Sequence, residues 1–430
     1  MREVLIASLI VLSTVFAQTA EQRGAPTEFL TWLRENAHPL QSAIPTENDE
    51  DLILLKAMIG DARVVALGEA THGTSEFFTL KHRIVQFLAE EMGFTVFSIE
   101  ANMPEAYRLN EYMLTGEGDP RELLRDIHYL WMWNTQEVLD LILWMREYNA
   151  SGRGVMQFTG FDMQTPTVAM EEVRAFVKTY NPGYLAQVDR AYEAVERAFS
   201  LRRGRDATED ELEAWQSAAQ GVLTHLTNHE STYVGASQSE RAWAVQNARI
   251  VLQGGEYALT GTDKSVPNET SRDGSMAANV QWLLARNPDA RVVLWARNAH
   301  ILKAHQKKLM GERLSEALGD DYVSLGFTFY GGSFQARPRS GEAPQIHLTE
   351  DAPARSVEGV FHTLGLPLFL LDLRAGKQEQ ASWLAAPQDT RTVIGTIASR
   401  YQLSFSKRQL PKEYDALIFV DQMTPTDLLE

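Results

Sequence analysis

The sequence predicts an α/β fold, with a mainly parallel sheet, helices on both faces and a helical insertion that forms a cleft wall or lid. From Arg63 onward, short apolar runs alternate with longer helical stretches. The runs are apolar at nearly every position, which is typical of parallel strands buried on both faces. Between Thr167 and Leu259 the strand pattern gives way to amphipathic helices. The expected strands are 63–67, 95–99, 156–160, 291–296, 322–327, 368–371 and 416–420.

The first two expected strands flank a helix at 75–92. Its apolar residues, among them Phe78 and Leu88, fall on one side, and Gly93 follows its last residue, as glycine often does at helix ends. A strand, a helix and a strand in this order predict a β-α-β unit.

Residues 167–260 are expected to form the helical insertion of a single domain at 27–430. Two of its helices begin with a capping-box pattern, Thr208 with Glu211 and Ser237 with Glu240. Because the insertion lies between two strands, its helices can stand over the edge of the sheet. The alternative is that they pack against the sheet without a part in catalysis.

The first residues have the pattern of a secretory signal. A charged start and an apolar run at 4–16 precede small residues suited to signal peptidase, Val15 and Ala17. We expect a signal peptide at 1–17, a linker at 18–26 and a secreted or periplasmic mature protein outside the membrane. The apolar run is too short to span the ~30 Å hydrocarbon core comfortably, so a retained anchor is the lesser alternative.

The composition restricts the partners. The net charge of −17 would repel nucleic acid, so a small-molecule substrate is expected instead. The absence of cysteine excludes disulfides and a thiol nucleophile. The hydrophobic fraction of 44% is that of an ordinary globular protein.

Polar side chains follow four of the expected strands where each one ends. They are Glu69 with His72, Glu100, Asp162, and Arg297 with His300. In open α/β sheets the binding crevice lies outside the carboxyl ends of the strands. We therefore expect these side chains to converge around one cleft at that edge.

Glu69 and His72 are three residues apart, between Gly68 and Gly73, which permit tight backbone paths. A carboxylate this close can orient an imidazole, fix its tautomer and raise its basicity. The alternative is that Glu69 caps the following helix or pairs with a core arginine.

Glu100 follows an apolar strand, so we expect it to be partly buried beside a positive or protonated partner. His300 by itself could be a structural core histidine, but Arg297 one helical turn earlier favours a polar site. For Asp162, a strand-end cap and a site residue both stay open.

Several chemistries find no support in the sequence. It lacks a G-x-S-x-G elbow, a phosphate-binding P-loop, a G-x-G-x-x-G after a strand and an H-E-x-x-H helix. Glu69, His72, Glu100 and His300 would suit a divalent metal, but their spacing does not require one, so no cofactor is expected. What remains is water activated by a histidine base.

At these residues the sequence resembles the erythromycin esterase family, which includes succinoglycan biosynthesis-type proteins. The resemblance spans roughly residues 27–425 in unchanged order. The matching segments are Val64 to Gly73, Glu76-Phe77-Phe78, Lys81, Gly93-Phe94, Glu100, Gly160-Phe161-Asp162, Arg272-Asp273, Met276-Ala277, Trp295 to His300, and Gly319 to Gly326.

The resemblance implies hydrolysis of a macrolide lactone ester by water, an activity linked to antibiotic resistance, with His72 as general base. The family's acidic residues fall on Glu69 and Glu100, and a basic residue of the first helix falls on Lys81. The expected catalytic residues are therefore His72, Glu69, Glu100 and His300, and the expected substrate-binding residues are Arg297, Lys81 and Asp162.

The family's C-terminal histidine pair falls on Arg297 and His300, so the first position departs from the family pattern. Arginine cannot shuttle a proton or ligate a metal, but it can hold an oxyanion or a substrate carboxylate. Three hypotheses follow: a metal-independent esterase for an ester or lactone, a metal-dependent hydrolase of a non-macrolide substrate, and a non-catalytic binding protein.

Overall fold

The computed structural model describes residues 24–45, 48–127, 131–203, 208–260, 272–304, 308–338, 342–374, 381–392 and 405–429. The expected signal peptide at 1–17 lies outside these residues, as does most of the expected linker at 18–26. Within the described part of the chain, every helix is too short or too polar to cross a membrane.

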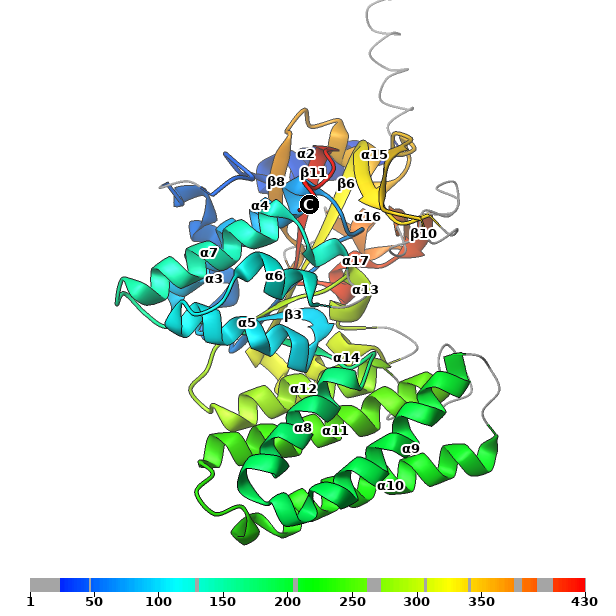
Figure 1. Ribbon diagram of the computed structural model, residues 1–430. Helices are drawn as coiled ribbons and strands as arrows, with labels where there is room; N and C mark the ends of the chain where they lie inside the picture. Colours follow the sequence, from blue (N-terminus) through cyan, green and yellow to red (C-terminus); the bar gives the residue numbers. More distant parts are fainter. Residues whose placement is uncertain are drawn as a thin grey trace, which may run out of the picture.

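A nine-stranded sheet forms the centre of the molecule (Figure 1). The order is β1-β8-β11-β6-β2-β5-β3-β4, and β7 pairs with β6. All neighbours from β11 to β4 are parallel, so the predicted mainly parallel sheet is confirmed. The strands are β1 (His38–Pro39), β2 (Val64–Leu67), β3 (Val96–Asn102), β4 (Gln157–Asp162), β5 (Val292–Trp295), β6 (Tyr322–Ala336), β7 (Gln345–Thr349), β8 (Leu368–Asp372) and β11 (Ala416–Met423), while β9 (Gln388–Arg391) and β10 (Phe405–Arg408) form a separate antiparallel pair.

Helices connect most of the strands. The α-helices are α2 (Thr27–Asn36), α3 (Ile53–Ile59), α4 (Ser75–Met92), α5 (Met103–Thr115), α6 (Pro120–Arg125), α7 (Gln136–Ala150), α8 (Thr167–Tyr180), α9 (Leu185–Arg203), α10 (Glu209–Asn228), α11 (Gln238–Thr260), α12 (Arg272–Arg286), α13 (Asn298–Ile301), α14 (Met310–Leu318), α15 (Val357–His362), α16 (Ser382–Ala385) and α17 (Leu410–Glu413). Short 3-10 turns are η1 (Glu50–Leu52), η2 (Trp131–Trp133), η3 (Pro182–Tyr184), η4 (Glu230–Thr232) and η6 (Gly319–Asp321).

The β2-α4-β3 unit has the expected form. Helix α4 has the predicted bounds and ends at Gly93, whose φ of 68° is left-handed and whose backbone N–H donates to the Leu88 carbonyl. All four residues of β2 are buried, as the apolar pattern predicted.

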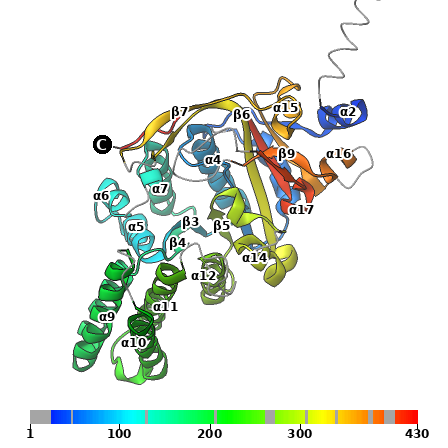
Figure 2. The ribbon, with the colours of Figure 1, turned by 90° about the vertical axis from the view of Figure 1, so that its right-hand side faces the viewer.

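The apolar residues of the strands alternate between two cores, one on each face of the sheet. Val65 and Leu67 of β2 pack with α3, α4, α5 and α7 in one core. Val64 and Ala66 pack with α2, α12, α14, α15, α16 and α17 in the other. Figure 2 shows α4, α5 and α7 on one side of the sheet and α14, α16 and α17 on the other. Helices on both faces confirm the predicted layer order.

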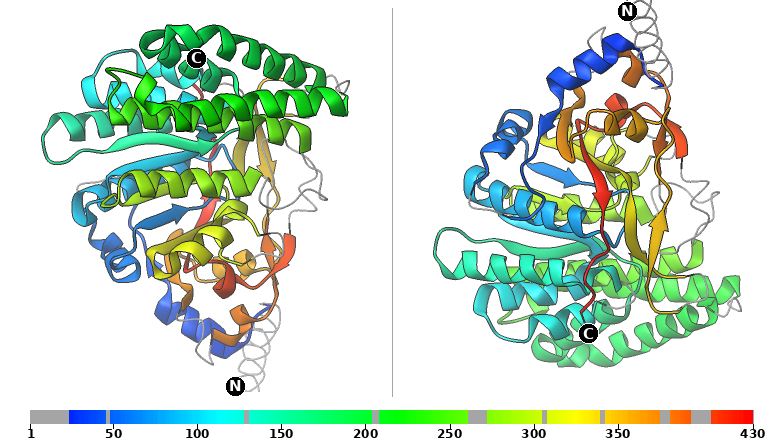
Figure 3. Two further views of the ribbon diagram at one scale, coloured as in Figure 1. Left: turned by 90° about the horizontal axis from the view of Figure 1, so that it is seen from below. Right: turned by 90° about the horizontal axis from the view of Figure 1, so that it is seen from above.

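Helices α8 to α11 lie between β4 and β5 in the chain and form most of a third core, which also includes Met103 of α5 and Leu283 of α12. Both capping boxes are present, because Thr208 exchanges hydrogen bonds with Glu211, and Ser237 with Glu240. The Gln246 side chain of α11 donates to Asn279 of α12 at 2.9 Å and ties the insertion to the sheet domain. Figure 3 shows these helices at one end of the molecule, opposite α2.

Candidate active site

The candidate site residues follow neighbouring strands at the carboxyl edge of the sheet. Strand β5 lies between β2 and β3, and its Trp295 is in register with both Leu67 and Ile99. The residues that follow these three strand segments therefore emerge side by side. The backbone N–H of Arg297 donates to Glu100 Oε2 at 3.0 Å.

Glu69 is the centre of the first group of polar side chains. Its side chain is fully buried, with Lys81 Nζ and Trp295 Nε1 each donating to Oε2 at 2.7 Å and His72 Nδ1 in hydrogen-bond contact with Oε1. Three partners thus hold one carboxylate in a fixed orientation. The ring nitrogen Nδ1 of His72 is committed to Glu69, so Nε2 is the ring atom that can accept a proton from elsewhere.

The opposite charges in this group stabilise one another although the side chains are buried. Burial alone would raise the pKa of the Glu69 carboxyl, but the charges of Lys81 and His72 outweigh it and hold that pKa below its usual value. Burial lowers the pKa of Lys81 to about 8, against the attraction of Glu69. At neutral pH both groups are therefore charged.

The loop that carries Glu69 and His72 passes close to other backbone and side-chain atoms. A Cβ at Gly68 would lie 2.1 Å from Asn298 Oδ1, and one at Gly73 would lie 2.3 Å from the Gln335 carbonyl oxygen. Gly73 also has a φ of 74°, in the left-handed region. The two glycines are thus needed for the path that brings His72 back to Glu69.

Glu100 is the centre of the second group. Arg272 and Arg297 each donate an NH2 hydrogen bond to its Oε1 at 2.8 Å, and His300 Nε2 lies 3.3 Å from the same oxygen. Burial alone would raise the pKa of the Glu100 carboxyl, but Arg297, His300 and Arg272 hold it well below its usual range. The expectation of a buried carboxylate with positive partners is met by these contacts.

His300 belongs to a second acid–histidine pair. Its Nδ1 lies 2.7 Å from Asp273 Oδ1, at the start of α12, and Asp273 also accepts from the Met310 backbone N–H. Burial lowers the pKa of His300, but the charges of Asp273 and Glu100 outweigh it and the net shift is upward. On its other side, His300 Nε2 lies 2.9 Å from Arg297 NH2.

The two groups come from opposite faces of the sheet and meet at its edge. Lys81 and Trp295 surround Glu69 on the face covered by α4, whereas Arg272 begins α12 on the other face. The backbone N–H of Asn298, next to Arg297, donates to the Glu69 carbonyl at 2.9 Å. The expected single cluster is therefore two adjoining groups that share the end of β5.

Two residues expected to bind substrate are buried under the site instead. Lys81 has no exposed surface and is paired with Glu69, and Asp162 has none either and accepts from Arg272 at 2.6 Å. Their contacts position Glu69 and Arg272, and a substrate-binding role for Lys81 and Asp162 stays a prediction. Arg297, whose side chain is 24% exposed, is accessible.

Arg272, Asp273 and Trp295 are polar partners of the site that were not assigned from the sequence. Arg272 and Asp273 lie far along the chain from the residues they contact, and Trp295 resembles any core aromatic in a strand. The available signal was the position of each residue, at the start of a helix or the end of a strand, inside segments that matched the family.

The donor set at Glu100 does not suit a divalent cation. Two permanently charged guanidinium groups, from Arg272 and Arg297, already occupy this carboxylate and would repel a metal ion. In the parts of the chain that the structure describes, no group of three or more His, Asp or Glu side chains has a metal-binding arrangement. The arrangement of these residues therefore does not support the metal-dependent alternative.

A cavity of about 480 Å³ opens at this edge of the sheet. Glu69, Ala70 and Arg297 contribute to its lining, and none of its lining residues comes from 167–260. Its apolar wall consists of Leu309, Leu410, Tyr414 and Leu417, and its polar wall includes Thr328, Thr390 and Arg391. The space is of the size that small-molecule sites occupy.

A parallel sheet with two acid–histidine pairs at its carboxyl edge defines an α/β protein with a polar candidate site at that edge. Comparison with known proteins identifies the family. The chain belongs to the erythromycin esterase family, a family of hydrolases, whose model matches residues 89–423. This span includes Glu100, Arg297 and His300, while Glu69 and His72 precede it.

Curated relatives cover nearly the whole chain. Erythromycin esterase type II from Escherichia coli is 26% identical over 93% of this chain and 99% of its own length. The putative hydrolase YbfO from Bacillus subtilis (strain 168) is 24% identical over 98% of this chain and 97% of its own length.

Solved structures have the same fold. A Bacillus cereus protein of 29% identity matches with a TM-score of 0.82, covering 94% of this chain and 99% of its own. A mutant erythromycin esterase in its open conformation matches at 20% identity with a TM-score of 0.69, covering 89% of this chain and 96% of its own. At that identity the second match supports the fold alone.

Proposed function

We propose that this hydrolase cleaves an ester or lactone by direct attack of water, with His72 as the general base. The observation that carries the proposal is the buried pair of Glu69 and His72 Nδ1, in which Glu69 lines a cavity at the carboxyl edge of the sheet. The similarity to an erythromycin esterase supports a lactone such as a macrolide as one substrate class.

In the proposed reaction, Nε2 of His72 removes a proton from water as the water oxygen bonds to the carbonyl carbon. The charged Glu69 stabilises the imidazolium that forms. The tetrahedral intermediate then expels the alkoxide, the carbon–oxygen ester bond breaks, and the imidazolium returns the proton to the leaving oxygen. The products are a carboxylic acid and an alcohol, which in a lactone remain on one molecule.

Arg297 is partly exposed and lines the same cavity as Glu69, so we assign to it the developing oxyanion. Its guanidinium donates to Glu100 and lies 2.9 Å from His300 Nε2, and His300 is in turn oriented by Asp273. Because His300 lies with Glu100 rather than with His72, we propose that it positions Arg297 and does not itself transfer a proton to substrate.

The test is turnover of a panel of esters and lactones, macrolides among them, by wild-type protein and by His72→Ala. A general base contributes about 10²- to 10⁴-fold, so we expect a loss of that size with the melting temperature little changed. His229→Ala, on the exposed surface of the helical insertion, is the matched control and should keep wild-type rates.

Each outcome decides between the hypotheses. Wild-type rates in His72→Ala would refute the mechanism. Loss of turnover with a chelator, restored by a divalent ion, would favour the metal-dependent alternative. Binding of a macrolide without any turnover would favour the binding-protein alternative, in which Arg297 has replaced a catalytic histidine.

We further propose that the protein acts outside the cytoplasm, on the basis of the apolar run at 4–16. Cell fractionation with an antibody against the full chain tests this. Recovery in the cytoplasm at full length would contradict it.

A further inference from the structure

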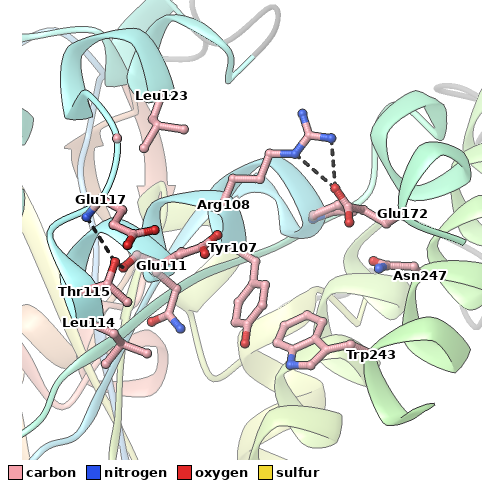
Figure 4. A pocket seen from close by; sticks show the side chains of 13 residues that line it. Tyr107, Arg108, Glu111, Leu114, Thr115, Glu117, Leu123, Glu172, Trp243 and Asn247 are labelled. Atoms are coloured by element: carbon pink, nitrogen blue, oxygen red, sulfur yellow. Dashed lines mark hydrogen bonds and ion pairs between the residues drawn. The ribbon is translucent and has the colours of Figure 1, made fainter. Parts of the chain in front are cut away.

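A second cavity, of about 780 Å³, lies between the sheet domain and the helical insertion (Figure 4). Helix α5 forms one wall, with residues up to Leu123 of α6, and α8 and α11 form the other. Its lining shares no residue with the cavity beside Glu69. The space is large enough for a ligand of several hundred daltons.

The charge of this cavity is predominantly negative. Its lining contains three carboxylates, those of Glu111, Glu117 and Glu172, against one guanidinium, that of Arg108. Arg108 pairs with Glu172 at 2.9 Å and with Glu171 at 3.1 Å, so the negative surplus of the lining comes from Glu111 and Glu117. A ligand that enters therefore meets a surplus of hydrogen-bond acceptors with negative charge.

Asn247 adds a side-chain hydrogen-bond acceptor that has no donor. It is 7% exposed, contributes to the cavity lining, and its Oδ1 has no hydrogen-bond partner among the described residues. Leaving a buried polar group without a hydrogen-bond partner is unfavourable. A ligand N–H or O–H that reached Asn247 would satisfy it.

The floor of the cavity is aromatic. The rings of Tyr107 and Trp243 stack with their centroids 3.8 Å apart, and Figure 4 shows both below the ion pair of Arg108 and Glu172. Arg286 lies 5.6 Å from the Trp243 ring and helps fix it. Electron-rich rings beside carboxylates are a surface that attracts organic cations.

We infer that this cavity binds an organic ammonium ligand that carries several hydrogen-bond donors, such as an amino sugar or a polyamine. The carboxylates supply the charge, Asn247 takes a donor, and the Tyr107–Trp243 stack contacts the carbon skeleton. The ligand would bridge α5, which follows the Glu100 strand, and the helical insertion. This inference does not depend on ester hydrolysis at His72.

The test is isothermal titration of the full-length protein with glucosamine, spermidine and glucose. We expect binding of at least one amine, weakened by added salt, and no binding of neutral glucose at the same concentrations. Binding of glucosamine alone would identify an amino-sugar site, and binding of spermidine alone a polyamine site. Absence of binding by both amines at millimolar concentration would overturn the inference.

Variants locate the site. Glu111→Gln with Glu117→Gln should weaken amine binding about tenfold, equal to ~1.4 kcal/mol, and Asn247→Leu should weaken it further. Glu193→Gln, an exposed carboxylate of α9 outside the cavity, should leave the affinity unchanged, as should His72→Ala. Equal weakening by Glu193→Gln, or no weakening by the Glu111 and Glu117 pair, would contradict the location.

Discussion

The buried Glu69 carboxylate accepts hydrogen bonds from Lys81 and Trp295 and contacts His72, whose side chain keeps 4% exposure. Such an arrangement serves two purposes that a mutation can separate. It neutralises a buried lysine, which affects stability, and in the proposed mechanism it stabilises the imidazolium of His72, which affects catalysis.

Glu69→Gln should therefore reduce both properties. Removing one partner of a buried ion pair costs about 3–5 kcal/mol, so we expect a clearly lower melting temperature. Turnover should fall less than in His72→Ala, because the amide still holds the ring but does not stabilise its charged form. The double variant Glu69→Gln with Lys81→Met should regain stability without regaining turnover, and parallel recovery of both would contradict the separation.

Lys81 predicts an alkaline limit to activity. Its pKa is about 8, compared with an ordinary value of 10.5, so its charge is lost as the pH rises through about 8 and Glu69 loses its counterion. Turnover should fall over that range. Lys81→Arg, which stays charged, should extend activity to higher pH, and an unchanged alkaline limb in that variant would contradict the assignment.

The same lysine affects stability in the opposite sense. Between about pH 8 and 10.5 the unfolded chain binds the Lys81 proton more tightly than the folded chain does, so this group makes the free energy of unfolding rise with pH. Denaturant titrations at several pH values, compared with those of Lys81→Met, isolate this contribution.

Arg297→His tests the departure from the family pattern. The imidazole would restore a titratable group at this position, while Arg272 would still pair with Glu100. Because Arg297 holds the oxyanion in the proposed mechanism, turnover of the protein's own substrate should fall. If macrolide hydrolysis appears or increases, measured by loss of the intact lactone, the arginine is what separates this protein from the macrolide esterases of the family. If macrolide turnover does not change, Arg297 is not what separates this protein from the erythromycin esterases of the family.

At the scale of elements, the loop between β2 and α4 determines where His72 lies. Gly73 and Gly93 both have left-handed backbone, with φ values of 74° and 68°, but only Gly73 is crowded. A Cβ in this region costs roughly 1–2 kcal/mol in either case.

Gly73→Ala should cost more than Gly93→Ala. The added methyl group at Gly73 would meet the Gln335 carbonyl and displace His72, whereas nothing lies within 4 Å of a Cβ at Gly93. We expect Gly93→Ala to lower the melting temperature without affecting turnover, and Gly73→Ala to lower both. Equal effects on turnover would show that the loop tolerates rearrangement.

The bounds and directions of the helices and strands were predicted from the sequence with different success. Helix α4 has its predicted bounds, since apolar periodicity and a C-terminal glycine are local signals. Strand β6 extends from Tyr322 to Ala336, well beyond the predicted 322–327, because its far half pairs with β7 and β11. The direction of β8 was also unforeseen, since antiparallel pairing with β11 depends on how the chain returns to the sheet.

At the scale of the whole molecule, the sheet separates two cores and the insertion builds a third. The polar groups gather where these parts meet. One acid–histidine pair lies on each face at the carboxyl edge, and the acidic cavity lies where α5 meets the insertion. The expected lid role of 167–260 over the His72 site stays a prediction, and a crosslink between the insertion and the sheet domain that left turnover unchanged would oppose it.

The sequence by itself determined the α/β class, most of the strand positions and the pairing of Glu69 with His72, because these depend on periodicity and on neighbours three residues apart. Only the tertiary structure decided which distant side chains complete each group. Trp295 reaches Glu69, Arg272 reaches Glu100, and Asp273 reaches His300 through the order β2-β5-β3 and the start of α12. The burial of individual side chains was also decided only by the tertiary structure, because exposure depends on all the elements packed around a residue. Lys81 and Asp162 lie beneath the site for this reason.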